Sequence, residues 1–172
     1  MEQKPEPMKT EEDQSSNSSQ ETTVNDIQEI LYSIKLGDLN YDESLKLAEK
    51  YKAEGNEFFK QNRFLEALEK YTQAIDLKVE TKNNAIYYSN RAFVNLNLEN
   101  YGSAILDANY ALKIDSEFYK AYYRRAGAYF SLGKFAEALK DYLFLKTKIT
   151  NDSTLDEKIA KTRKAKKKRN FL

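Results

Sequence analysis

The chain has 172 residues, of which 41% are apolar and 32% are charged, and its formal net charge at pH 7 is +1. It contains no histidine and no cysteine, which excludes disulfide bonds, thiol chemistry and imidazole groups acting as bases or metal ligands. It has no run of about 20 apolar residues that could span a membrane, and its acidic N-terminus lacks the apolar core of a signal peptide. We therefore expect a cytoplasmic protein with one domain plus tails, with no membrane segment, metal, cofactor or catalytic residue.

Charge is distributed unevenly along the chain. Residues 1–50 hold 5 basic and 12 acidic groups, whereas residues 151–172 hold 8 basic and 3 acidic groups. Residues 1–24 are mainly Glu, Gln, Ser, Thr and Lys. Their few large apolar groups cannot offset the entropy lost on ordering the segment. We expect residues 1–24 to be a disordered acidic and polar tail.

A short helical pattern follows the tail. Apolar residues recur at the spacing i, i+3, i+4 and i+7 from Ile27 to Ile34, which predicts an amphipathic helix over residues 26–36 within a helix-and-linker segment 25–41. A helix of three turns is marginally stable alone. It therefore packs on the rest of the chain, stays partly melted or docks a partner.

The next part of the chain repeats itself three times. Its two series of small residues mark places where paired helices touch, and the second series advances by 37 and then 34 residues. A period near 34 with an aromatic residue four positions before the small residue is typical of the tetratricopeptide repeat (TPR), a helix-turn-helix unit. The first series is Gly55, Ala92 and Ala126, and the second is Ala67, Ala104 and Ala138.

We therefore predict a TPR domain over residues 42–150, with large aromatic side chains filling its core. The longer first step is explained by about three extra residues in the connection 79–83. The units span about residues 45–82, 83–117 and 118–150, and their helices span residues 42–61, 63–78, 84–98, 101–114, 118–131 and 135–148.

Residues 151–172 are expected to form a capping helix with a basic tail. An array of repeats needs a terminal element to cover its last apolar face. Leu155 and Ile159 supply apolar contacts, and Ser153 or Thr154 can cap the helix. The predicted fold class is all-α: a right-handed superhelical array of three TPR units followed by a capping helix.

Five polar residues on the first helices of the units share one angular position. Counted at about 100° per residue from the small residue of each helix, they fall within an arc of about 100°, away from the core aromatics. Stacking of the units brings these arcs side by side on the concave face, where the only acid is Glu49. The five residues are Lys52, Asn56, Asn90, Lys120 and Arg124.

This set of side chains suits a ligand with two or more carboxylates. Lys and Arg donate charge-assisted hydrogen bonds, and Arg can bind one carboxylate with two parallel bonds. Asn offers both an N–H donor and a carbonyl acceptor. A chain-terminal Asp carries two carboxylates, and capture of a peptide C-terminus is a known binding mode.

The five residues resemble the carboxylate clamp of chaperone-binding TPR proteins. That resemblance implies a monomeric co-chaperone adaptor that binds the Glu-Glu-Val-Asp tails of the seventy- and ninety-kilodalton heat-shock chaperones. In the implied roles, Lys52, Asn56 and Asn90 hold the terminal carboxylates, while Lys120 and Arg124 reach the backbone and the preceding acid.

Over residues 45–150 the sequence is most similar to the N-terminal domain of the serine/threonine phosphatase five family, as in Asn84-Ala-Ile-Tyr-Tyr-Ser-Asn-Arg91. This likeness suggests the regulatory domain of such a phosphatase, without the catalytic domain.

The basic run over residues 161–169 supports an alternative reading. A run this basic can bind nucleic acid or act as a nuclear import signal, which would place the protein in the nucleus as well. The repeats would then be a scaffold for another peptide. The simpler interpretation is a solvated end of the capping helix. No aromatic RNA-recognition motif accompanies the run, so nucleic acid is not expected as a partner.

Overall fold

The computed structural model describes residues 39–79 and 81–169. The predicted tail over residues 1–24 and the predicted helix over residues 26–36 lie outside the described residues. The described part of the chain contains seven α-helices and no strand, as the predicted all-α class requires. The helices are α2 (Tyr41–Lys60), α3 (Phe64–Asp76), α4 (Asn84–Asn97), α5 (Tyr101–Ile114), α6 (Tyr119–Ser131), α7 (Phe135–Lys148) and α8 (Ser153–Arg169).

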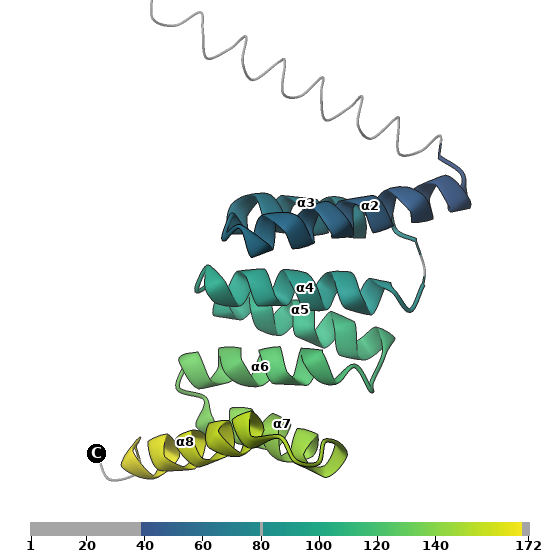
Figure 1. Cartoon of the computed structure of the whole chain (residues 1–172). Coiled ribbons are helices and arrows are strands. Elements are labelled where there is room, and N and C mark those ends of the chain that lie inside the picture. The colour runs from purple at the N-terminus through teal and green to yellow at the C-terminus, as the bar shows by residue number, and fades with distance from the viewer. Residues whose placement is uncertain (1–38, 80, 170–172) are drawn as a thin grey trace, which may run out of the picture. The chain divides into compact units, whose positions relative to one another are not determined.

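The helices pair in chain order and the pairs stack. Helix α2 packs on α3, α4 on α5 and α6 on α7, while α3 contacts α4, α5 contacts α6 and α8 covers α7 (Figure 1). The first helices of the second and third pairs, α4 and α6, also touch each other. Each of the six predicted repeat helices is present, with ends within two residues of the expected ones. The three repeats and the capping helix are confirmed.

Each repeat turns between its two helices with one residue in the left-handed backbone region. The three residues are Asn62 with φ 59°, Glu99 with φ 59° and Gly133 with φ 70°. They lie seven positions after the small residue of the first helix in every repeat. Gly133 and Asn62 are residue types that tolerate this conformation.

The capping helix begins differently from the prediction. The carboxylate of Asp152, rather than Ser153 or Thr154, accepts the N–H of Leu155 at 3.0 Å. A carboxylate satisfies the free N–H group and also places negative charge at the positive end of the helix. The predicted apolar contacts are confirmed, because Leu155 and Ile159 are buried against the last repeat.

The core differs from the expectation of large aromatic side chains. Alanine occupies most of its buried positions, beside the buried rings of Tyr71, Tyr87 and Tyr142, while other aromatic residues, such as Tyr88 and Tyr122, are only partly buried around these contacts. Alanine lets helix backbones approach closely, and the partly buried aromatic rings pack around each contact. The alanines with no more than 1% exposure are Ala48, Ala67, Ala74, Ala85, Ala92, Ala104, Ala108, Ala111, Ala121, Ala126, Ala128 and Ala138.

The extra residues between α3 and α4 are anchored in the core. Lys78 adopts a left-handed conformation with φ 50°, and the next residue, Val79, is only 3% exposed. Val79 packs with Ala74 of α3 and Tyr87 of α4. The longer connection therefore adds an apolar contact between the first two repeats.

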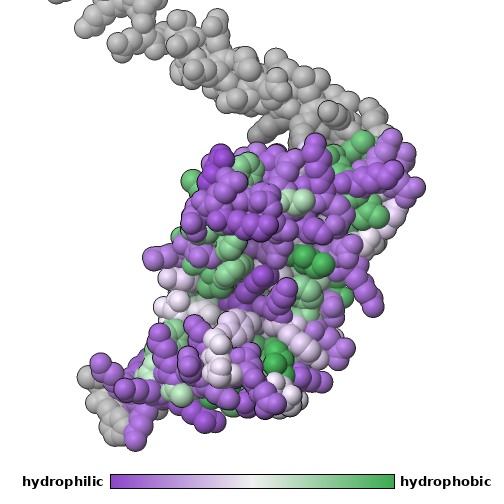
Figure 2. All heavy atoms as spheres, in the orientation of Figure 1, coloured by the Kyte–Doolittle hydropathy of each residue, from purple (hydrophilic) through white to green (hydrophobic). Residues whose placement is uncertain are grey.

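The described surface mixes polar and apolar groups. Figure 2 shows one face on which hydrophobic atoms appear in separate patches among hydrophilic ones. No helix within residues 39–79 and 81–169 combines the length and apolarity needed to cross a membrane.

Gly55 lies at a close contact between the two helices of the first repeat. A Cβ atom at this position would lie 2.9 Å from Cε1 of Tyr71, closer than real side chains approach. At Gly102, in the first turn of α5, a Cβ would meet nothing within 4 Å. The two glycines therefore separate the effect of packing from that of helix propensity.

We expect Gly55→Ala to lower the free energy of unfolding by about 1–3 kcal/mol, because the overpacked Tyr71 ring must move. Gly102→Ala should raise it by at most about 0.5–1 kcal/mol through helix propensity. Urea denaturation followed by circular dichroism measures both. A Gly55→Ala protein as stable as Gly102→Ala would contradict the close contact.

A candidate carboxylate-binding site on the first helices

Repeated ion pairs fix the first helix of each repeat against its second helix. In the second repeat, Arg91 of α4 makes a two-pronged pair with Asp107 of α5 at 2.8 and 3.0 Å. In the third, Arg125 of α6 pairs with Asp141 of α7 at 2.8 Å through both oxygens. Both aspartates are about 4% exposed, so each pair is largely desolvated and holds its two helices in one orientation.

The same arginines also bind the preceding repeat. Arg91 donates to the hydroxyl of Thr72 on α3 at 3.1 Å, and Arg125 donates to the side-chain oxygen of Asn109 on α5 at 2.7 Å. Thr72 and Asn109 occupy equivalent positions on their helices, five residues after the small residue. Each arginine therefore sets the angle between successive repeats as well as within one.

The first repeat makes the equivalent pair with its charges exchanged. Glu54 of α2 occupies the arginine position, and Lys70 of α3 occupies the aspartate position, with Nζ and Oε2 2.8 Å apart. The ammonium of Lys70 lies over the ring of Tyr51 at 5.2 Å. The guanidinium groups of the other repeats lie similarly over Tyr88 and Tyr122, at 5.6 and 5.3 Å.

Three of the five predicted site residues meet directly. The amide of Asn90 on α4 donates to Oδ1 of Asn56 on α2 at 3.3 Å. Arg124 on α6 donates to Oδ1 of Asn90 at 3.4 Å. One chain of hydrogen bonds thus connects the first helices of all three repeats.

The two predicted lysines lie beside this chain. Lys52 precedes Asn56 by four residues on α2, and Lys120 precedes Arg124 by four residues on α6. Each lysine therefore lies on the same helix face, one turn before its neighbour. Lys120 is exposed and has no carboxylate within 4.0 Å among the described residues. Lys52 is less free, because its ammonium contacts the carboxylate of Glu49. Together, Lys52, Asn56, Asn90, Lys120 and Arg124 are called the candidate cluster below.

Two residues that sequence analysis did not identify complete the hydrogen bonding. The hydroxyl of Tyr71 on α3 donates to Oδ1 of Asn56 at 2.7 Å, and the buried hydroxyl of Ser89 accepts from Arg124. Ser89 directly precedes Asn90 in sequence, and Tyr71 is the ring that faces Gly55. From the sequence, Ser89 could have been identified only as the neighbour of Asn90, and Tyr71 only as the partner of Gly55.

Burial changes the titration of two of these groups. Desolvation lowers the pKa of the Arg124 guanidinium to about 10, which still leaves it a cation at neutral pH. Desolvation raises the pKa of Tyr71 to about 12, against the opposing effect of the nearby Arg124 charge. The phenol therefore remains a neutral donor to Asn56.

Most of the unused hydrogen-bonding capacity of the cluster consists of donors. Oδ1 of Asn56 accepts two bonds, while Oδ1 of Asn90 and the oxygen of Ser89 each accept one from Arg124. Among the described residues, the amide nitrogen of Asn56, the ammonium of Lys120 and the remaining guanidinium N–H groups of Arg124 have no acceptor. Such a surface is suited to an anionic ligand.

An aromatic residue that sequence analysis also missed borders the cluster. Phe93 on α4 lies one turn after Asn90 and is 40% exposed. Its ring centroid is 4.8 Å from that of Phe59 and 5.1 Å from the guanidinium of Arg124. The candidate cluster thus has an apolar side next to its charged one.

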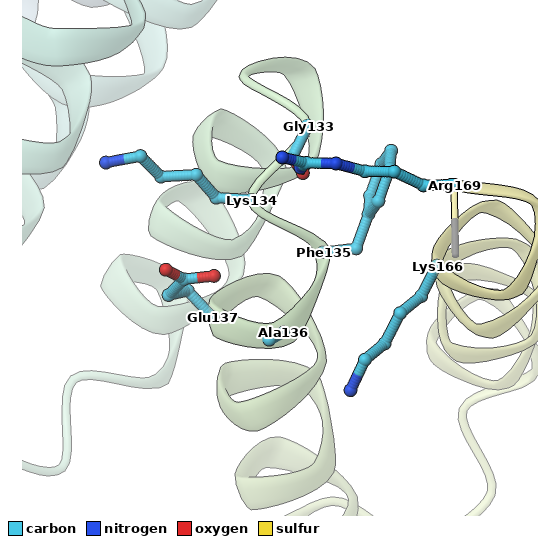
Figure 3. Close-up of a pocket in the computed structure, with 7 residues that line it drawn as sticks. All are labelled: Gly133, Lys134, Phe135, Ala136, Glu137, Lys166 and Arg169. Carbon is cyan, nitrogen blue, oxygen red and sulfur yellow. The ribbon is translucent and has the colours of Figure 1, made fainter. Parts of the chain in front are cut away.

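A pocket of about 470 Å³ lies away from the candidate cluster. Arg169 and Lys166 of α8 reach toward the start of α7, with Phe135 between them, while Lys134 points to the other side (Figure 3). The basic run over residues 161–169 forms the C-terminal half of α8. Its alternative role in nucleic-acid binding or nuclear import stays a prediction. The described residues contain no group of three His, Cys, Asp or Glu side chains that could hold a metal ion.

The fold and the cluster define a helical-repeat protein with an anion-accepting face. No protein-family model matches the chain, but solved structures do. The TPR domain of Arabidopsis OM64 is 32% identical with a TM-score of 0.66, covering 70% of this chain and 98% of that domain. The chain belongs to the TPR-domain family.

Two further comparisons bear on the ligand. The first TPR domain of Spaghetti (RPAP3), solved bound to the HSP90 peptide SRMEEVD, is 31% identical with a TM-score of 0.66, covering 70% of this chain and 94% of that one. Human serine/threonine-protein phosphatase 5 is 45% identical over 101 residues, which are 59% of this chain. The match spans only about one fifth, 20%, of the phosphatase.

The carboxylate of Glu49 should make stability depend on pH. Burial opposes its ionisation, but hydrogen bonds from Lys52 and Tyr87 outweigh burial and hold the pKa of Glu49 below its usual range. Because the folded-state pKa lies below the unfolded one, this contribution to stability is present at neutral pH and is lost as the pH falls through the folded-state pKa. Between about pH 7 and about pH 3, the original protein should therefore lose more unfolding free energy than Glu49→Gln. Urea denaturation at the two pH values tests this, and equal losses would contradict it.

Proposed function

We propose that this chain is a peptide-binding adaptor that captures the acidic C-terminal tail of heat-shock chaperones with its candidate cluster. The observation that carries the proposal is the excess of unpaired donors on one face. Asn56, Asn90 and Arg124 from three repeats are joined there by hydrogen bonds that leave N–H groups without an acceptor among the described residues, and Lys52 and Lys120 lie one helical turn away. A peptide ending in Asp presents two carboxylates to such a face.

The proposed roles of the residues are those that the resemblance to the carboxylate clamp implies. Lys52, Asn56 and Asn90 would bind the two terminal carboxylates, and the position of the two asparagines within the hydrogen-bonded chain supports this assignment. Lys120 and Arg124 lie on α6, one repeat further, where the preceding residues of an extended peptide would pass. The exposed ring of Phe93 offers an apolar contact beside them.

The comparisons support the same class of ligand. One related TPR domain binds the HSP90 peptide SRMEEVD, and that peptide ends in Glu-Glu-Val-Asp. The likeness to phosphatase 5 covers residues of the repeats, so we infer a binding module rather than an enzyme. A role as the regulatory domain of a phosphatase is part of this proposal. Testing that role requires a longer chain that includes a catalytic domain.

Loss of the terminal carboxylate should weaken binding strongly. We expect the free peptide Ser-Arg-Met-Glu-Glu-Val-Asp to bind with a micromolar dissociation constant, or about −7 to −8 kcal/mol. Amidation of its C-terminus should weaken binding at least about tenfold, since each lost charge-assisted hydrogen bond costs about 1.5–3 kcal/mol. Isothermal titration calorimetry with both peptides measures the difference. Equal affinities would exclude capture of the C-terminus.

Charge reversal at the exposed lysine should abolish binding without unfolding the chain. Lys120→Glu replaces a donor with a carboxylate that repels the ligand, and we expect at least about a hundredfold loss of affinity. Lys140→Glu on α7 makes the same charge change on an exposed residue of a second helix and should change affinity little. Thermal unfolding of both variants checks the fold. If the two substitutions weaken peptide binding equally, the ligand does not bind at the candidate cluster.

A further inference from the structure

Glu49 is held by two helices at the edge of the candidate cluster. One carboxylate oxygen contacts the ammonium of Lys52, one turn later on α2. The other accepts a hydrogen bond at 2.6 Å from the hydroxyl of Tyr87 on α4. Tyr87 is fully buried, with 0% exposure, so its hydroxyl is a fixed donor that keeps the carboxylate in place.

This pair differs from other pairs of the same spacing. Lys60 with Glu57 and Arg63 with Glu66 are also three residues apart, but their cationic side chains are 69% and 50% exposed. The side chain of Lys52 is 23% exposed. Pairs on open surface contribute little and exchange freely with solvent, whereas the Lys52 pair is partly enclosed and tied to the neighbouring repeat.

Glu49 also stands alone among the charges of the site. Within residues 39–79 and 81–169, neither Lys120 nor Arg124 has a carboxylate within 4.0 Å, so Lys52 is the one cation of the candidate cluster that already carries such a partner. The group it carries is chemically the same as the group that a peptide C-terminus would bring. A ligand carboxylate must therefore displace Glu49 from Lys52 or bind beside its negative charge, and either event costs free energy.

We propose that Glu49 is an internal competitor for the ligand, a carboxylate that occupies Lys52 in the free protein and thereby limits affinity for peptide C-termini. This inference rests on the proposed function, because it assumes that Lys52 binds the ligand. Tyr87 strengthens the competition by anchoring the carboxylate from the second repeat. Glu49 is thus a residue that limits affinity for the ligand.

The test compares two neutral substitutions of matched geometry. Glu49→Gln removes the charge and keeps the side-chain shape and an oxygen for Tyr87. Glu66→Gln on α3 removes a carboxylate from a pair with the same three-residue spacing, outside the first helices. With the peptide Ser-Arg-Met-Glu-Glu-Val-Asp, Glu49→Gln should lower the dissociation constant about three- to tenfold, and Glu66→Gln should leave it unchanged. Circular dichroism confirms that both variants are folded.

Repeating the Glu49→Gln comparison in a protein that lacks Lys52 tests whether Glu49 acts by occupying that lysine. If Glu49 acts by occupying Lys52, the gain from Glu49→Gln should disappear in a Lys52→Met protein, whose weaker binding is the reference. A gain that persists without Lys52 would overturn competition in favour of a long-range charge effect. Unchanged or weaker binding by Glu49→Gln alone would also overturn it, while leaving the proposed function intact if the original protein binds the peptide. A complete lack of binding by the original protein would overturn both.

Discussion

The close contact of helix backbones at alanine and glycine positions is the constraint on which the other features depend. Because Ala92 and Ala126 present almost no side chain, each packs closely among buried residues of its own repeat and of the next element along the chain. The stacked pairs then place Asn56, Asn90 and Arg124 where their side chains form hydrogen bonds across three helices. Ion pairs between half-buried arginines and buried aspartates then hold the angle between helices, so the position of each donor follows from backbone packing.

Much of the fold could be predicted from the sequence because its signals are local. The recurrence of small and aromatic residues gave helix ends within two residues, and the turn at Gly133 follows from its backbone freedom. Two predictions failed where three-dimensional context decides. Composition suggested a core filled by large side chains, but alanine occupies most of the buried positions, where helices approach closely, and only a few tyrosines are buried beside it. Asp152 caps α8 in place of Ser153 because its carboxylate reaches the first free N–H groups.

The candidate site was predictable as a set but not as a network. Angular counting along each helix shows which side chains share a face, and the five residues of the candidate cluster do share one. It cannot show the bonds that join them, because these depend on the separation and rotation of different helices. Tyr71, Ser89 and the Tyr87–Glu49 contact therefore emerged only from the structure. Their importance is chemical, since they determine which lone pairs and N–H groups remain for a ligand.

The exchanged charges of Glu54 and Lys70 give the array a direction. The second and third repeats each donate hydrogen bonds from an arginine to the unit before them, whereas the first repeat has an acid, Glu54, at that position. The repeats are consequently not interchangeable. If the first repeat were moved to an interior position, the hydrogen bond from an arginine to the preceding repeat would be missing there. The reversed ion pair thus distinguishes the first repeat from the two that follow it.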